Sequence, residues 1–248
     1  MEGAALLGRL TWQLADVLDV VVENARVKTL ALDVPEWPGH KTGQHVDVRL
    51  TAEDGYRAER SYSIASAPSG TRIELTVECL EDGEVSPYLS DELRPGDKLE
   101  LRGPVGGYFV WEPALGGPVL LVGGGSGVVP LMAMIRERAA AGSDVDMRLL
   151  YSSRSWGDVI YRDELGRLAG RGLTVAHTLT RSQPDGWNGY ARRVDAEMLT
   201  DVGPASGDRP HVYVCGPTPL VEAVAATLVE LGHEPQRIKT ERFGPTGG

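Results

Sequence analysis

The apolar periodicity of this chain changes near residues 113–118, and the change limits the chain to folds with two differently built halves. Before this point, short Val-rich runs alternate apolar with polar residues, a pattern typical of β-strands. After it, apolar runs alternate with segments of helical periodicity, which indicates parallel strands covered by helices. Gly116-Gly117-Pro118 interrupts both patterns. We therefore expect two domains, residues 1–114 and residues 115–248.

The first half predicts a six-stranded antiparallel β-barrel, because its strand-like runs are short and closely spaced. Turn clusters such as Glu53-Asp54-Gly55 and Arg94-Pro95-Gly96-Asp97 separate the runs. One short helix is expected over residues 86–93. The strands are expected over residues 15–22, 27–34, 45–50, 61–66, 72–80 and 98–103.

The second half predicts an α/β domain with a five-stranded parallel sheet. Its strands are expected over residues 119–123, 147–153, 173–179, 211–216 and 237–243. The helical segments between them are expected over residues 130–141, 161–169 and 219–232.

Composition and charge disfavour several classes of protein. A hydrophobic content of 42% with 24% charged residues is typical of a globular protein. The net charge of −10 disfavours binding to nucleic acid, because phosphate contacts need clustered Lys and Arg. No apolar run approaches the roughly 20 residues that span a bilayer, and no secretory signal pattern is present. We expect a cytoplasmic protein that does not bind a membrane.

Two cysteines, Cys79 and Cys215, lie far apart in strand-like runs, where buried thiols are common. Two thiols cannot supply the ligands that an iron-sulfur cluster usually takes. We expect no metal site in this chain. If the protein passes electrons to an iron-sulfur cluster, that cluster lies on a separate chain.

Three segments of the first half suggest a ligand site. Arg60-Ser61-Tyr62-Ser63 is expected at the start of a strand, where Tyr62 faces away from both serines; taken alone, it fits an edge strand with a surface Arg equally well. Residues 81–89 place Gly83 and Ser86 before a short helix, where free amides can face an anion or Ser86 can act as a plain N-cap. Residues 102–109 supply glycines that suit either a bulky neighbour or a tight turn.

A glycine-rich loop follows the first strand of the second half. Glycines allow a backbone to approach a pyrophosphate, whose charge then lies at the helix N-terminus. The spacing differs from G-x-G-x-x-G because Val128 takes the third position, and no Gly-Lys-Ser/Thr of a P-loop follows. We interpret the loop as a nucleotide-binding turn of another kind. Its residues are Gly123, Gly124, Gly125, Ser126 and Gly127.

The ends of the later strands carry further candidates. Ser153 and Arg154 end the second strand, where an Arg can accept the 2′-phosphate of NADP and an acid would favour NAD. Arg181 and Arg193 are expected to converge on the same phosphate. Cys215-Gly216-Pro217 ends the fourth strand, in the region where open α/β sheets bind ligands; an inert buried thiol before a helix is the alternative.

In this order, an R-x-Y-S strand, a G-x-x-S-x-x-L helix start, a GGGSG loop and a late C-G-P resemble the ferredoxin-NADP reductase superfamily. The resemblance covers roughly residues 10–244. Its pattern is most similar to bacterial ferredoxin or flavodoxin reductases and to reductase components of oxygenases, without their appended iron-sulfur domain.

The resemblance implies a role for each candidate residue. Arg60, Val85 and Ser86 would bind the flavin pyrophosphate, with Ser61 beside them in the same motif. Tyr62 would pack on the flavin ring, and Ser63 would hydrogen-bond near its N5. Residues 123–127 would hold the pyrophosphate of NAD(P)H. Cys215, Gly216 and Pro217 would guide the nicotinamide toward the flavin. Glu241 and Phe243 occupy the place of the family's C-terminal active-site segment, although this chain continues five residues past Phe243.

From the resemblance we expect hydride transfer from NADPH to FAD, with NADH as a possible donor, and with Ser63, Cys215 and Glu241 as catalytic residues. One-electron delivery to a ferredoxin, a flavodoxin or an oxygenase component would follow. Two alternatives are a flavin reductase that releases reduced flavin, and a flavin-bearing electron-transfer subunit that does not oxidise NAD(P)H.

Overall fold

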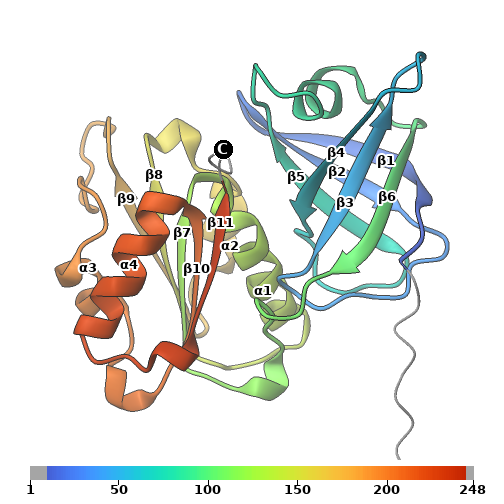
Figure 1. The fold of residues 1–248 in the computed structure, drawn as a ribbon. Helices are drawn as coiled ribbons and strands as arrows, with labels where there is room; N and C mark the ends of the chain where they lie inside the picture. Colours follow the sequence, from blue (N-terminus) through green and yellow to red (C-terminus); the bar gives the residue numbers. More distant parts are fainter. Residues whose placement is uncertain (1–9, 244–248) are drawn as a thin grey trace, which may run out of the picture.

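A computed structural model of the chain describes residues 10–243 as two lobes, a β-barrel and an α/β lobe (Figure 1). Among these residues no helix is both long and apolar enough to cross a membrane.

The barrel contains six antiparallel strands in the order β4-β3-β6-β1-β2-β5, as the sequence predicts. Val46 and Val48 show how alternation builds its core, since both are fully buried on one face of β3. A bridge between Ile64 and Leu75 joins the two outer strands and closes the sheet. The strands are β1 (Gln13–Asn24), β2 (Val27–Asp33), β3 (His45–Thr51), β4 (Arg57–Ser63), β5 (Arg72–Glu78) and β6 (Lys98–Val105).

The prediction of a strand over residues 61–66 is wrong in position. β4 begins at Arg57 and ends at Ser63, so the R-S-Y-S motif lies at the end of the strand. Pairing with β3 from Thr51 back to His45 holds the whole segment. Between Arg57 and Ser61 this segment buries only Ala58, and apolar alternation therefore does not mark where it starts.

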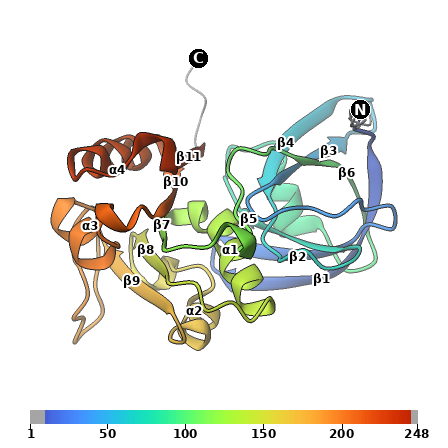
Figure 2. The ribbon, with the colours of Figure 1, turned by 90° about the horizontal axis from the view of Figure 1, so that it is seen from below.

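The α/β lobe contains five parallel strands in the order β11-β10-β7-β8-β9, which confirms the predicted sheet. Helices α1 and α2 cover one face, and α3 and α4 cover the other (Figure 2). The sequence pattern did not predict α3. The elements are β7 (Val119–Gly124), α1 (Val128–Ala140), β8 (Met147–Ser153), α2 (Arg162–Leu168), β9 (Leu173–Leu179), α3 (Ala196–Val202), β10 (His211–Pro217), α4 (Thr218–Glu230) and β11 (Ile238–Phe243).

Short helical turns complete the fold. The expected helix near residue 86 contains a π-turn, η1 (Tyr88–Glu92), whose end is marked by the Leu93 amide donating to the Tyr88 carbonyl at 3.1 Å. The other turns are η2 (Pro113–Leu115), η3 (Gly125–Gly127), η4 (Trp156–Asp158), η5 (Ser206–Asp208) and η6 (Pro235–Arg237).

The segment between β6 and β7 is bound to the α/β lobe. The Tyr213 hydroxyl donates to the Val110 carbonyl at 2.8 Å, and the Tyr108 hydroxyl donates to the Ile238 carbonyl at 3.3 Å. The boundary expected between residues 114 and 115 falls inside η2 and stays a prediction.

Candidate functional site

A cleft of about 1130 Å³ lies between the lobes and is lined by residues of both. A volume of this size accommodates a ligand as large as a flavin ring with a second ring beside it. Thirteen of the residues selected from the sequence line it: Arg60, Ser61, Tyr62, Ser63, Val85, Ser86, Gly124, Gly125, Ser126, Ser153, Arg154, Pro217 and Phe243.

Sheet topology explains why the α/β lobe presents these residues at one edge. From β7 the chain crosses through α1 to β8, while β10 pairs with the opposite side of β7. The strand order therefore reverses between β7 and β10, and the loops that follow the two strands diverge. Open α/β sheets bind ligands in the crevice at such a point.

The R-S-Y-S motif reaches the cleft from the end of β4. The Ser61 hydroxyl donates to the Asp47 carboxylate at 2.7 Å, and Ser63 is buried. Burial raises the pKa of Tyr62 to about 12, so its phenol is neutral at physiological pH. Arg60 remains exposed, with its guanidinium 2.6 Å from the carboxylate of Glu84.

The turn after β5 brings Val85 and Ser86 to the same cleft. The Leu80 amide donates to the Ser86 hydroxyl at 3.1 Å, and no side chain caps the helical turn that follows. Ser86 thus fixes the turn that precedes it rather than acting as a plain N-cap.

The glycine loop takes a shape that side chains would prevent. Gly125 has a φ of +54°, and its carbonyl accepts a hydrogen bond from the Tyr151 hydroxyl at 3.1 Å. A Cβ on Gly127 would lie 2.2 Å from the Cys215 carbonyl oxygen, so this glycine lets the loop pack against the end of β10. Gly124, Gly125 and Ser126 line the cleft, whereas Gly123 and Gly127 do not.

Cys215 and Glu241 occupy paired positions on β10 and β11. Cys215 is fully buried, and burial together with the nearby Glu241 carboxylate raises the pKa of its thiol. Burial also raises the pKa of Glu241 to about 7. One carboxylate oxygen of Glu241 is buried with no hydrogen-bond partner among residues 10–243. Neither side chain lines the cleft, and neither does Gly216, whereas Pro217 and Phe243 do.

The three candidate arginines lie in different places. Arg154 lines the cleft beside Ser153. Arg181 lies next to it, because the Arg181 amide donates to the Arg154 carbonyl at 2.9 Å. Arg193 is exposed in the segment before α3, and neither Arg181 nor Arg193 lines the cleft.

The sequence reasoning missed several residues that line the cleft, among them Asn24, Arg26, Thr76, Asp158 and Ile160. They come from three separate segments of both lobes, and none belongs to a motif with ligand chemistry. Only the tertiary arrangement brings them together, so the sequence alone carries no signal for them.

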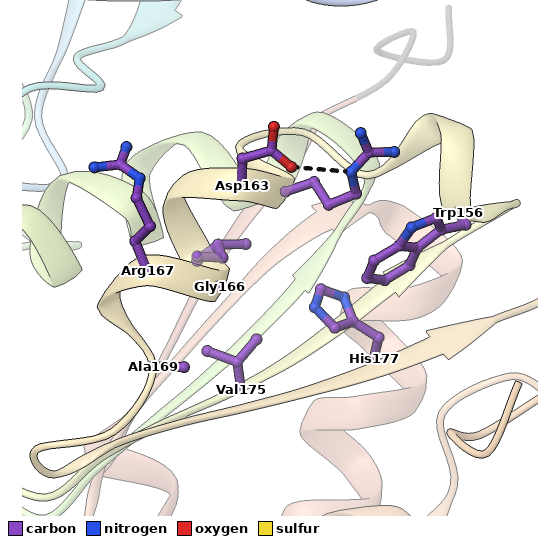
Figure 3. A pocket seen from close by; sticks show the side chains of 9 residues that line it. Trp156, Asp163, Gly166, Arg167, Ala169, Val175 and His177 are labelled. Carbon is purple, nitrogen blue, oxygen red and sulfur yellow. Dashed lines mark hydrogen bonds and ion pairs between the residues drawn. The ribbon is translucent and has the colours of Figure 1, made fainter.

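A second hollow of about 770 Å³ lies between α2 and β9 (Figure 3). The rings of Trp156 and His177 meet edge to face there, with centroids 5.2 Å apart, and burial lowers the pKa of His177 to about 4. No residue selected from the sequence lines this hollow. The cleft between the lobes is therefore the candidate functional site.

Two family models match the two halves of the chain. Residues 16–110 match an oxidoreductase FAD-binding domain, and residues 121–226 match an oxidoreductase NAD-binding domain.

The chain is also similar to known proteins along most of its length. It is 37% identical to a ferredoxin-NADP reductase B of Sorangium cellulosum, over 82% of this chain and 85% of that protein. It is 34% identical to a glycine betaine monooxygenase reductase subunit of Pseudomonas aeruginosa, over 95% of this chain; it spans 66% of that protein's length.

A solved structure has the same fold. The FAD/NAD-binding domain of a nitric oxide dioxygenase from Vibrio cholerae superposes with a TM-score of 0.83 at 26% identity, covering 94% of this chain and 99% of that chain.

Proposed function

The chain belongs to the family of FAD- and NAD-binding oxidoreductases that includes the ferredoxin-NADP reductases, and from this premise we propose that it oxidises NADPH through FAD and delivers the electrons singly to a separate redox protein. The observation that carries the proposal is the cleft, in which the end of β4 and the glycine loop after β7 line one continuous space.

The residues of the cleft fit both cofactors. The exposed guanidinium of Arg60 suits a pyrophosphate, and the half-buried ring of Tyr62 offers a flat apolar surface to a flavin. The space over Gly125 is open, since a Cβ there would meet nothing within 4 Å. A phosphate can therefore approach the loop at the start of α1. FAD, when bound, supplies a ring that accepts a hydride and afterwards gives up electrons one at a time.

The side chains of this chain bind, orient and shield the cofactors. In this proposal Arg60, Val85 and Ser86 hold the flavin pyrophosphate, and the Ser63 hydroxyl hydrogen-bonds near the reacting nitrogen. The loop from Gly123 to Gly127 holds the nicotinamide dinucleotide. The end of β10, from Cys215 to Pro217, orients the nicotinamide. Phe243 closes the site from β11, and Glu241, buried two positions earlier on the same strand, is able to hold a proton behind the cleft wall because burial raises its pKa to about 7.

A preference for NADPH is supported by the position of Arg154. Its exposed side chain lies at the end of β8 on the wall of the cleft, and Arg181 lies at the adjacent strand end. Guanidinium groups bind phosphate through paired hydrogen bonds, and Arg193 would approach from the segment before α3.

The proposed electron acceptor is a ferredoxin, a flavodoxin or an oxygenase component. The glycine betaine monooxygenase reductase subunit is named as part of such a system. An iron-sulfur cluster would lie on the acceptor, because the described chain supplies only Cys79 and Cys215. The cytoplasmic location stays a prediction.

An anaerobic titration tests the proposal. The protein is reconstituted with FAD, freed of excess flavin by gel filtration, and titrated with NADPH while the visible flavin band is recorded. We expect a yellow holoprotein whose band bleaches with an equimolar amount of NADPH. Arg60→Met should weaken FAD binding, while Arg49→Met, which removes an ion pair with Glu100 outside the cleft, should not. Failure to bind FAD contradicts the proposal, and bound FAD that NADPH does not reduce contradicts the proposed donor.

A further inference from the structure

Arg136 of α1 joins the two lobes through hydrogen bonds and ion pairs of its mostly buried side chain. Its side chain is only 16% exposed. One guanidinium nitrogen donates to the Ala65 carbonyl and to the Glu74 carboxylate of the barrel, both at 2.9 Å. The other two donate to the Glu164 carboxylate of α2 at 3.0 and 2.7 Å.

Tyr161 completes this cluster from the start of α2. Its ring lies under the Arg136 guanidinium, with 5.0 Å between the guanidinium carbon and the ring centroid. Its hydroxyl donates to the Thr76 hydroxyl of β5, so it too crosses between the lobes. Tyr161 is fully buried and has a φ of +57°, a conformation that a bulky residue adopts only when its surroundings hold it. We call these five side chains the Arg136 cluster: Arg136, Glu74, Glu164, Tyr161 and Thr76.

The cluster borders the cleft, since its member Thr76 is itself one of the cleft residues. Ala65 follows the cleft residue Ser63 by two positions, and Glu74 precedes the cleft residue Thr76 by two. On the other lobe, Tyr161 follows the cleft residue Ile160. A shift of Arg136 would therefore move the cleft wall formed by the barrel relative to the cleft wall formed by the α/β lobe.

Burial distinguishes this cluster from another ion pair that joins the lobes. Arg26 pairs with Asp158 at 3.3 Å, but its side chain is 46% exposed. Exposed pairs are screened by water and salt and contribute little. Arg136 forms charge-assisted bonds to two carboxylates in a partly buried place, where the loss of Arg136 would leave two neighbouring carboxylates without the cation between them.

We propose that Arg136 is a positioning residue for the reaction, and that its cluster fixes the relative placement of the two lobes and thereby the approach of the nicotinamide to the flavin. The inference rests on the proposed function. Hydride transfer needs the two reacting atoms at near contact, and a displacement of about 1 Å from a distant change can slow such a step by about 100-fold.

The test compares Arg136→Met with Arg138→Met. Arg138 lies two positions along α1 and is also buried, but its guanidinium donates to the Val145 and Arg171 carbonyls within the α/β lobe. Two milder variants are also compared. Arg136→Lys keeps the positive charge but removes the branched guanidinium group, and Tyr161→Phe removes only the hydroxyl that donates to Thr76. For each FAD-loaded variant, stopped-flow absorbance gives the rate of flavin reduction by NADPH and by NADPH deuterated at the transferred position.

We expect Arg136→Met to lower the limiting rate of flavin reduction by tenfold or more, with the affinities for FAD and NADPH within about twofold of the wild type. Arg136→Lys should restore part of the rate, and Tyr161→Phe should lower it less. Arg138→Met should keep the wild-type rate even where it lowers the unfolding temperature. An Arg136→Met rate within twofold of the wild type, or an equal loss in Arg138→Met, overturns the inference. If Arg136→Met does not fold, wild-type rates in both milder variants overturn it.

A distance measurement separates this inference from the proposed function. Spin labels are attached to cysteines replacing Leu18 on the barrel and Val229 on α4, which are 47% and 45% exposed, in a Cys79→Ser background. The distribution of label distances should broaden in Arg136→Met and stay narrow in Arg138→Met, whether or not NADPH reduces the flavin. Identical distributions in the two variants overturn the inference, whereas a wild-type holoprotein that NADPH does not reduce contradicts only the proposed function.

Discussion

Arg60 and Glu84, which both line the cleft, form an ion pair with 2.6 Å between guanidinium nitrogen and carboxylate oxygen. The Tyr56 hydroxyl donates to the same carboxylate at 2.7 Å, and the bonds from Tyr56 and Arg60 lower the pKa of Glu84. If Arg60 binds the flavin pyrophosphate, Glu84 competes with that phosphate for the same guanidinium. We predict that Glu84→Gln increases the affinity for FAD by about threefold, the size expected for an exposed charge pair.

Fluorescence quenching of FAD on binding measures this effect, at low and at high salt. Glu59→Gln is the control, because Glu59 is an exposed acid on the same strand as Arg60 but contacts Arg102, at 3.7 Å. The gain in Glu84→Gln should shrink at high salt as the competition is screened. Weaker FAD binding in Glu84→Gln would mean that Glu84 orients Arg60 rather than competing with the phosphate.

Gly127→Ala should abolish reduction by NADPH while leaving FAD binding intact. The new Cβ would lie 2.2 Å from the Cys215 carbonyl oxygen and 2.6 Å from the Gly216 Cα, so either the glycine loop or the end of β10 must move. Gly166→Ala in α2 is the control, because its Cβ would meet nothing within 4 Å and alanine favours the helix. Turnover with NADPH and an artificial acceptor, beside FAD content, measures the difference. Equal activity in both variants would contradict the requirement for a residue without a side chain at position 127.

Arg154→Ala should raise the KM for NADPH by tenfold or more and leave the KM for NADH nearly unchanged. The reason is that only NADPH carries the 2′-phosphate that a guanidinium binds through charged hydrogen bonds. Arg193→Ala is the comparison at an exposed site outside the cleft, and we expect it to have a smaller effect. Steady-state kinetics with both donors measures the two changes. Equal effects of Arg154→Ala on NADPH and NADH would contradict the phosphate role.

The two-lobed architecture could be predicted from the sequence because each lobe has its own apolar period. Leu120 and Leu121 show why the sequence predicts the parallel strands: they are buried on opposite faces of β7, which therefore reads as one apolar run. β4 shows where this reasoning stops, since it is held by pairing with β3 and carries charged residues on the surface. Its start was therefore misplaced.

The residues of the site also fall into those that the sequence predicts and those that only the fold reveals. Motifs that are continuous in the sequence, such as residues 60–63 and the glycine loop, place most of their side chains in the cleft. Contacts between lobes leave no such mark. Arg136 and Tyr161 sit in helical segments of ordinary composition, and their partners Glu74 and Thr76 lie on a strand about sixty to ninety positions earlier. Only the folded chain shows that they meet.

Glu241→Gln should remove a pH dependence from the stability of the protein. Burial raises the pKa of Glu241 from 4.5 to about 7, so the fold favours the protonated carboxyl. This stabilisation is fully present below pH 4.5 and is lost as the pH rises to 7. Because Gln stays neutral, the variant should exceed the wild type in free energy of unfolding by an amount that grows through this range, to about 3 kcal/mol at pH 8. Urea unfolding across this range measures the difference, with Glu230→Gln, an exposed carboxyl at the end of α4, as the control. Parallel pH profiles for the wild type and Glu241→Gln would show that Glu241 is ionised in the fold at neutral pH.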